Sequence, residues 1–212
     1  MEPVRPTPTT PASTRERLLD AAAELFYREG IGVGTDALCR AANVSKRSMY
    51  QLFGSKDEVM AASLERSAPA YQAFLLPTDD VREPGARILH VFERLEALAT
   101  SPDYCGCPYV SITAELKSRQ HPASVVARRY KDALTAFFQY EAERGGVADP
   151  VLLGKQLTII FDGFSSRAVM QGTGVDSVAT VTVMTLLDAA GLVKSADRQD
   201  DGDAEPPQRA NG

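Results

Sequence analysis

Basic and hydroxyl-bearing side chains gather between residues 44 and 56, in the segment VSKRSMYQLFGSK. Lys46, Arg47 and Lys56 stand in it, with no acid among residues 45–56. Lys and Arg supply charge for phosphates and donors for guanine, and a Tyr hydroxyl reaches a phosphate oxygen. These residue types are suited to contact with DNA.

One short helix is expected to position these side chains. Val44, Met49, Leu52 and Phe53 fall near helical spacing on one face, which should turn inward. The opposite side then carries the polar residues Lys46, Arg47, Ser48, Tyr50 and Gln51. A basic amphipathic helix is also typical of an ordinary solvated surface, so the surrounding sequence has to decide between the two.

The residues before this helix predict a helix-turn-helix. Thr35 is expected to cap a helix of about eight residues whose small face would let two helices cross closely. Asn43 follows at the turn, since Asn tolerates the left-handed conformation better than any residue but Gly. Ser45 can then cap the second helix.

Capping signals frame this unit on both sides. Ser13 and Glu16 form a capping box that opens a first helix, and Gly30 is its expected end. A second box, from Ser55 to Glu58, opens the helix that follows the unit. Lys56 is a cation at a helix N-terminus, where a phosphate is favourable. Pairing with neighbouring acids or simple solvation stays an equal alternative for this lysine.

The rest of the chain predicts an all-α fold, with an N-terminal three-helix helix-turn-helix domain at 13–60 and a larger helical regulatory and dimerisation domain at 61–193. The last segment, 176–190, is ambiguous because its β-branched residues favour a strand. No partner strand is predicted elsewhere, so we expect a helix there. Further helices are expected at about 57–76, 88–99, 109–116, 124–144 and 150–171.

Composition limits the class of protein. The chain has 212 residues and a net charge of −5, which argues against non-specific coating of nucleic acid. No apolar run approaches the ~18 residues of a membrane span, and the Pro-rich start lacks the pattern of a secretory signal. We expect a cytoplasmic protein without membrane association, with a disordered arm at 1–12 and a disordered acidic tail at 194–212.

Residues 13–60 resemble the DNA-binding domain of the TetR/AcrR-type transcriptional repressor family. The segment TDALCRAANVSKRSMYQLFGSKDEV matches the family's pattern nearly position for position, including Tyr50, Phe53 and Lys56. The resemblance implies that Thr35 and Tyr50 contact phosphates and that Lys56 anchors one. It implies that Lys46, Arg47 and Ser48 approach base edges, and that Gln51 contacts a base or a phosphate.

Departures from the family pattern also carry expectations. Asn43 replaces the usual Gly, and Cys39 replaces a buried Ala. Arg47 stands where many members carry Gly or Pro, so its forked donor should make the operator distinctive. Leu52 falls where an aromatic or His is common, so one phosphate contact is expected to be missing.

For the remainder of the chain the resemblance implies a ligand-responsive homodimeric repressor. Such a protein binds a palindromic double-stranded DNA operator and is released by a small-molecule effector. The dimer would form through helices near 149–171 and 176–190. Six residues are expected to line the ligand pocket, although each type is more often found in a helical core. They are Tyr71, His90, Tyr104, Tyr109, Phe137 and Phe164.

Two alternatives remain open. The protein could be a thiol-responsive regulator that uses Cys105 and Cys107, or a DNA-binding regulator without an effector. Two thiols separated by one Gly are awkward for an unstrained disulfide, and no Cys/His cluster has the spacing of a zinc site. No nucleophile elbow, phosphate loop or HExxH motif occurs in the sequence. We therefore expect no enzyme activity, metal or cofactor.

Overall fold

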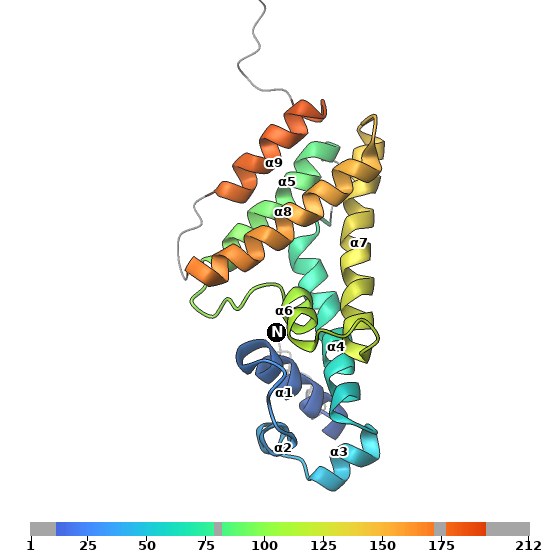
Figure 1. Cartoon of the computed structure of the whole chain (residues 1–212), viewed down its shortest axis with the longest axis vertical. Coiled ribbons are helices and arrows are strands. Elements are labelled where there is room, and N and C mark those ends of the chain that lie inside the picture. The colour runs from blue at the N-terminus through green and yellow to red at the C-terminus, as the bar shows by residue number, and fades with distance from the viewer. Residues whose placement is uncertain (1–11, 79–81, 172–176, 194–212) are drawn as a thin grey trace, which may run out of the picture.

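The computed structural model describes residues 12–78, 82–171 and 177–193, and within these ranges it is built from helices without strands (Figure 1). This confirms the predicted all-α fold. The predicted arm, apart from Ala12, and the predicted acidic tail lie outside the described residues. The helices are α1 Thr14–Glu29, α2 Thr35–Ala42, α3 Lys46–Leu52, α4 Lys56–Leu75, α5 Pro84–Ala99, α6 Pro108–Leu116, α7 Pro122–Arg144, α8 Pro150–Gln171 and α9 Val178–Ala189.

The caps predicted for the first helices are present. Ser13 and Glu16 satisfy each other's backbone N–H groups, at 2.9 Å and 3.2 Å, and Gly30 ends α1 with a φ of +78°. The Ser45 hydroxyl accepts from the backbone N–H of Ser48 at 3.0 Å and starts α3. Between these caps, fully buried Leu18, Leu38 and Met49 hold α1, α2 and α3 around one small core.

Asn43 makes the turn between α2 and α3 in the left-handed conformation, with a φ of 53° and a ψ of 52°. Replacing Asn43 by Ala should therefore lower the free energy of unfolding by about 1 kcal/mol, because a Cβ-bearing residue without a compensating polar group is strained there. Asn43→Gly should be neutral or stabilising. Urea denaturation monitored by circular dichroism measures both variants, and equal stabilities of the Ala and Gly variants would contradict this account.

The upper part of the molecule packs α5, α7, α8 and α9 around an aromatic core (Figure 1). The Phe92 ring stacks on Phe138 at 5.6 Å and meets Phe161 edge-on at 6.3 Å. The ambiguous last segment is helical as predicted, and α9 packs against α5 and α8. A helix satisfies its own backbone hydrogen bonds, so β-branching did not decide the structure here. No helix in the described ranges combines the length and apolarity that crossing a membrane requires.

Proline shifts three helix starts relative to the prediction. Proline occupies the first turn of α5, α6 and α7, at Pro84, Pro108 and Pro122. The missing N–H is harmless at that position, and the fixed φ suits a helix. Asp149 caps α8 as expected, since its carboxylate accepts from the backbone N–H of Leu152 at 2.9 Å.

Side-chain contacts join the N-terminal helices to the larger helical body. The Glu115 carboxylate at the end of α6 accepts from the backbone N–H of Ile31 at 3.0 Å. His121 Nε2 lies 3.2 Å from Asp57 Oδ2 at the start of α4. The loop after α5 contacts the last turn of α1. These contacts add to the packing of α1 against α4, which joins the N-terminal helices to the rest of the molecule.

Candidate nucleic-acid interface

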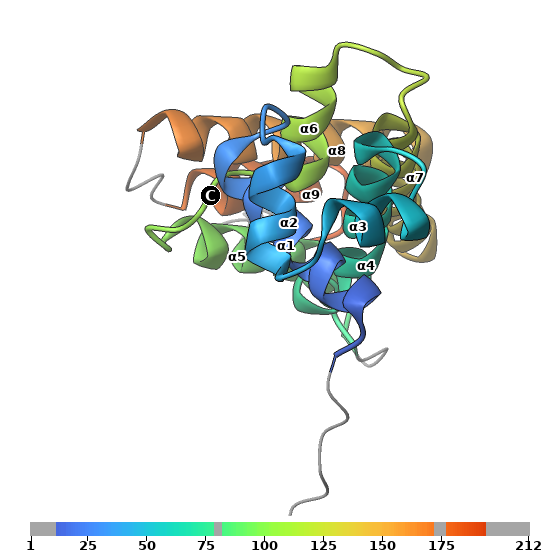
Figure 2. The same cartoon turned by 90° about the horizontal axis from the view of Figure 1, so that it is seen from below.

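Helix α3 presents a polar face at one end of the molecule. Met49 is fully buried beneath it, whereas Lys46, Arg47 and Gln51 are exposed and Tyr50 is 53% exposed. Seen from below, α2 and α3 lie side by side at this end (Figure 2). Donors that fit phosphates and base edges thus point to solvent. Met49 and Phe53 are buried as predicted, but Leu52, which was also expected to turn inward, is 41% exposed near the end of α3.

An acid from the neighbouring helix faces this surface. Asp36 in the first turn of α2 lies 2.8 Å from the Lys46 ammonium, and this hydrogen bond raises the pKa of Lys46. The positive charge predicted for this surface from residues 45–56 alone was therefore too high, because Asp36 lies outside that segment. Both side chains are exposed, and an exposed ion pair contributes little free energy. Lys46 can exchange Asp36 for a phosphate or a base edge at low cost.

Lys56 holds the loop between α1 and α2. Its ammonium donates to the carbonyl oxygens of Ile31 at 2.8 Å and Val33 at 3.1 Å. The sequence offered phosphate anchoring, pairing with adjacent acids or solvation, and did not predict these contacts with residues more than twenty positions away. Lys56 thus has a structural role in the protein, and a phosphate contact by its remaining N–H stays a prediction.

Thr35 is the first residue of α2 and not its N-cap, which corrects the prediction. Gly34 occupies the cap position and makes no side-chain hydrogen bond. The backbone at Gly34 is extended, and no described residue lies within 4 Å of where a Cβ would stand. The Thr35 hydroxyl is therefore not used in capping, and its predicted phosphate contact remains compatible with this position.

This unit is similar to known regulators in sequence as well as in shape. Residues 18–62 match the family model described as bacterial regulatory proteins, tetR family. The crystal structure of a putative TetR transcriptional regulator, sav143 from Streptomyces avermitilis, is 54% identical. The match covers 86% of this chain and 100% of that one, with a TM-score of 0.83. The chain belongs to the TetR family of transcriptional regulators.

More distant members share the fold. SCO4454, a TetR-family regulator from Streptomyces coelicolor, is 22% identical with a TM-score of 0.72, over 84% of this chain and 93% of that one. The reduced form of NemR from E. coli is also 22% identical, with a TM-score of 0.69. The match covers 84% of this chain and 97% of that one. The match of residues 18–62 to the tetR family model, with the 54% identical regulator, makes the helix-turn-helix of this TetR-family chain its DNA-binding unit.

The TetR-family body of this chain contains a cavity of about 400 Å³ between α1, α4, α6 and the loop after α5. Tyr71 and Tyr104, two of the residues expected at a ligand pocket, line this cavity. Tyr109 lies deeper, its ring 5.8 Å from that of Tyr71, and lines a narrower gap of about 30 Å³. Burial raises the pKa of all three phenols, which keeps them neutral well above pH 7.

The other three predicted pocket residues lie outside this cavity. His90 lies on α5, and its Nδ1 is 3.0 Å from a guanidinium nitrogen of Arg82, which precedes that helix. Phe137 packs beside Phe138, and Phe164 belongs to the core of α8. Apolar spacing on a helix cannot separate core aromatics from pocket aromatics, because both face inward.

Several lining residues had no sequence signal. Tyr27 and Ser111 border the cavity, although their types and spacing are those of ordinary helix surfaces. They become lining residues because α1 and α6 are brought together across the loop after α5. A single sequence does not show that α1 and α6 lie close together, and without that information Tyr27 and Ser111 could not be identified as lining residues.

The two neighbouring cysteines are free and differ in environment. Cys107 is 2% exposed, and burial raises the pKa of its thiol, which disfavours the reactive thiolate. The Cys105 thiol is half-buried and lies 3.5 Å from the carbonyl oxygen of Asp103. The described residues contain no cluster of three or more His, Cys, Asp or Glu side chains arranged for a metal ion.

Proposed function

We propose that this TetR-family protein is a cytoplasmic homodimeric repressor that binds a palindromic operator through the helix at residues 45–53 and is released by a small-molecule inducer. The observation that carries the proposal is the outward face of α3. Arg47, Tyr50 and Gln51 project from the end of the molecule over a core anchored by Met49. Such a helix fits the major groove, with Lys, Arg and Ser at base edges and Tyr at a phosphate.

The length of α3 supports a dimer. Lys46 and Tyr50 are four residues apart, which is about 6 Å of helix. A few side chains, each discriminating by about 1 to 3 kcal/mol, cannot select one site in a genome. Two copies of α3 on two half-sites supply the missing discrimination.

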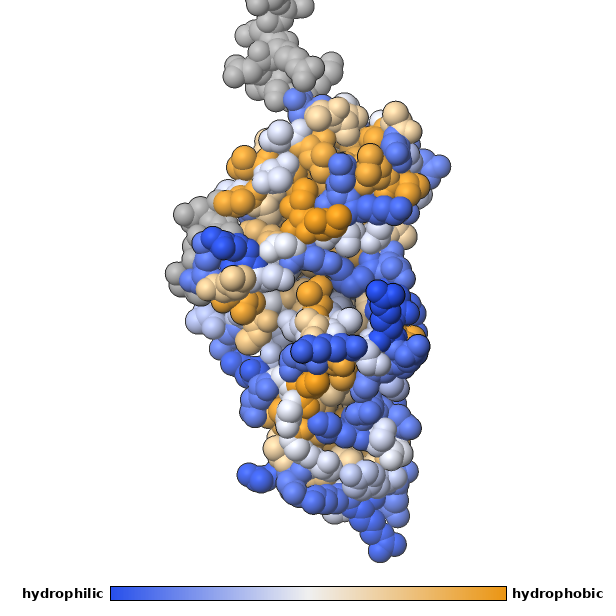
Figure 3. All heavy atoms as spheres, viewed as in Figure 1, coloured by the Kyte–Doolittle hydropathy of each residue, from blue (hydrophilic) through white to orange (hydrophobic). Residues whose placement is uncertain are grey.

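Exposed apolar side chains on the last two helices support the interface. Orange patches gather over the part of the molecule where Figure 1 shows α8 and α9 (Figure 3). Gly163 on α8 has open space where a Cβ would stand, so another helix can approach closely there. An apolar surface of this kind marks a protein interface. Its large exposed residues are Val151, Leu152, Ile159, Val169, Met170, Val178, Val181 and Met184.

The roles within α3 can be separated by two substitutions. Arg47→Ala should reduce operator affinity by about tenfold or more and relax base preference at one operator position, because a forked base-edge donor is lost. Tyr50→Phe should weaken binding to all sequences by a similar factor, because it removes a phosphate contact. Footprinting locates the operator, and fluorescence anisotropy with single-base operator variants measures both effects.

Tyr140→Phe is the matched control, since Tyr140 is 58% exposed on α7, away from α3. Its operator affinity should equal that of the unaltered protein. If Arg47→Ala and Tyr50→Phe changed the base preferences in the same way, the assignment of roles would be wrong. An unaltered protein that gave no footprint would contradict the proposed function.

A further inference from the structure

A helix of the DNA-binding unit forms one wall of the 400 Å³ cavity. Helix α1 contributes Phe26 and Tyr27, so a molecule inside the cavity would touch the DNA-binding unit directly. Helix α4, the loop after α5 and helix α6 supply the other walls. The volume lies in the range of about 300 to 1,000 Å³ that small-molecule sites occupy.

The lining has the chemistry of an uncharged site. Among the described residues, no Lys, Arg or His lines the cavity. Its two acids, Asp20 and Glu24, are each bound by an arginine: Arg66 contacts Asp20 at 2.6 Å and 3.2 Å, and Arg28 contacts Glu24. The rest of the lining consists of apolar side chains, serines and tyrosines. Both ion pairs are exposed, so they lie at the rim of the cavity and contribute little free energy. The apolar and hydroxyl-bearing remainder of the lining offers no fixed charge to a bound anion or cation.

We propose that this cavity is the effector site, that it takes an uncharged, largely apolar molecule, and that Tyr27 transmits its occupancy to the DNA-binding helices. This inference rests on the proposed release by an inducer. It adds the chemical class of that inducer, the place where it binds and the residue that couples the two sites.

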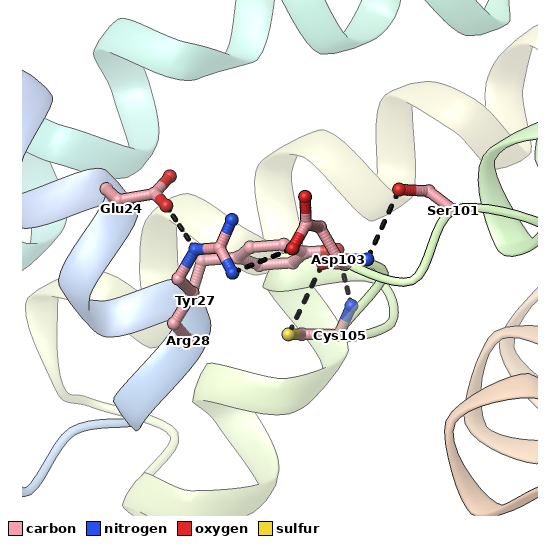
Figure 4. A network of polar contacts seen from close by, with 6 residues as sticks. All are labelled: Glu24, Tyr27, Arg28, Ser101, Asp103 and Cys105. Atoms are coloured by element: carbon pink, nitrogen blue, oxygen red, sulfur yellow. Dashed lines mark hydrogen bonds and ion pairs between the residues drawn. The ribbon is translucent and has the colours of Figure 1, made fainter. Parts of the chain in front are cut away.

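Tyr27 is suited to this role because its ring and its hydroxyl face different partners. Tyr27 lines the cavity. The hydroxyl accepts from the backbone N–H of Cys105 at 2.8 Å and donates to the carbonyl oxygen of Gly106 at 3.2 Å. Arg28 adds a second link, 3.0 Å from Asp103 in the same loop (Figure 4). A molecule that displaces the Tyr27 ring therefore also pulls on the link between α1 and this loop.

The same loop also touches the proposed dimer helix. Gly106 has a φ of +93°, and a Cβ there would lie 3.0 Å from Val169 Cγ2 on α8. The loop after α5 is thus held between α1 and α8. A shift of α1 against this loop changes its position relative to α8, and through the dimer it changes the separation of the two α3 helices. An effector acts by favouring the separation that does not fit the operator.

Two pairs of fluorescent probes test the ligand class. N-phenyl-1-naphthylamine and 8-anilino-1-naphthalenesulfonate share one aromatic framework, and only the second carries a negative charge. Diphenylhexatriene and its trimethylammonium derivative form the corresponding neutral and cationic pair. In each pair the neutral member should bind the full-length protein at least about tenfold more tightly. Equal or tighter binding of the charged member would overturn the assigned class.

Two cavity-filling variants test the location. Ser111→Phe on α6 should reduce the affinity for N-phenyl-1-naphthylamine by about tenfold or more, because the added ring occupies the cavity. Ala114→Phe, on the same helix but exposed and outside the cavity lining, is the matched control and should bind normally. Ala23→Phe fills the cavity from α1 and serves if Ser111→Phe fails to fold. Normal probe binding by a folded cavity variant would overturn the location.

Tyr27→Phe tests the coupling, since it keeps the ring and removes the hydroxyl. Saturating N-phenyl-1-naphthylamine should lower the operator affinity of the unaltered protein by about tenfold, and that of Tyr27→Phe by less than about twofold. The affinity of Tyr27→Phe for the probe should stay within about twofold of that of the unaltered protein, whereas a variant that had lost its structure would lose probe binding. Tyr140→Phe should behave like the unaltered protein.

The outcomes separate this inference from the proposed function. A protein that binds its operator and is not released by the bound neutral probe would overturn the inference and leave the repressor function standing. A protein that binds no DNA would remove the proposed function. In that case hydrogen exchange still decides the coupling, because the probe should speed exchange of the Cys105 amide in the unaltered protein and not in Tyr27→Phe. If the probe left the exchange rate of the Cys105 amide unchanged in both proteins, the proposed coupling through Tyr27 would be overturned.

Discussion

Replacing Ile159 by Asp is expected to convert the protein to a monomer and to lower operator affinity by about 10³-fold, roughly the lower end of the gap between specific and non-specific binding. Ile159 is 70% exposed on α8, so the isolated chain loses almost no packing. In a symmetric dimer the substitution places two carboxylates in an apolar contact, where their desolvation opposes association. Analytical ultracentrifugation measures the oligomeric state, and fluorescence anisotropy measures operator binding.

Val125→Asp is the matched control, because Val125 is 50% exposed on α7 and lies outside the proposed interface. It should remain dimeric and bind the operator normally. A dimeric Ile159→Asp protein would show that α8 does not form the interface through this residue. A monomeric protein with undiminished affinity would show instead that one copy suffices for specific binding.

Replacing Arg87 by Met is expected to lower the free energy of unfolding by about 3 kcal/mol, the largest loss expected from any substitution discussed above. Arg87 Nε donates to the carboxylate of Glu141 at 2.8 Å, where α5 meets α7. Glu141 is fully buried, and Arg87 is 6% exposed. Removal of the arginine leaves a buried carboxylate that retains the contact with Arg144 at 2.7 Å. Urea denaturation measures the change.

The double variant Arg87→Met/Glu141→Leu should recover most of this loss, since an apolar pair of similar volume avoids the desolvation of both charges. Arg129→Met is the control for a surface ion pair. Arg129 contacts Glu65 at 2.6 Å, but its side chain is 60% exposed, so the loss should stay below about 1 kcal/mol. A similar loss in Arg87→Met and Arg129→Met would show that burial does not govern the contribution of these pairs.

Local chemistry was predictable from the sequence wherever neighbouring residues interact. The capping box of Ser13 and Glu16, the left-handed Asn43 and the cap at Ser45 all depend on contacts within a few residues. Helix periodicity placed Leu18 and Met49 in the core for the same reason. These signals, with the typed positions of residues 35–59, were sufficient for the fold class and for the family.

Contacts between distant segments were not predictable. The sequence offered a phosphate, an adjacent acid or water for Lys56, and it did not predict the hydrogen bonds with Ile31 and Val33, beside which the phosphate contact stays a prediction. Lys46 was assigned to a surface without acids, and it meets Asp36 from the neighbouring helix. Long cationic side chains reach several ångströms from their backbone, so their partners depend on which helices pack together.

The sequence by itself determined that this chain is helical, which residues cap α1 and α3, and that α3 carries DNA-binding residue types on one face. Only the tertiary structure decided which residues enclose the cavity and how it is joined to the DNA-binding unit. Tyr27 and Cys105 are 78 positions apart, yet a hydrogen bond of 2.8 Å connects them. Caps and amphipathic faces are set by interactions along one helix, whereas cavities and couplings are set by the packing of several helices.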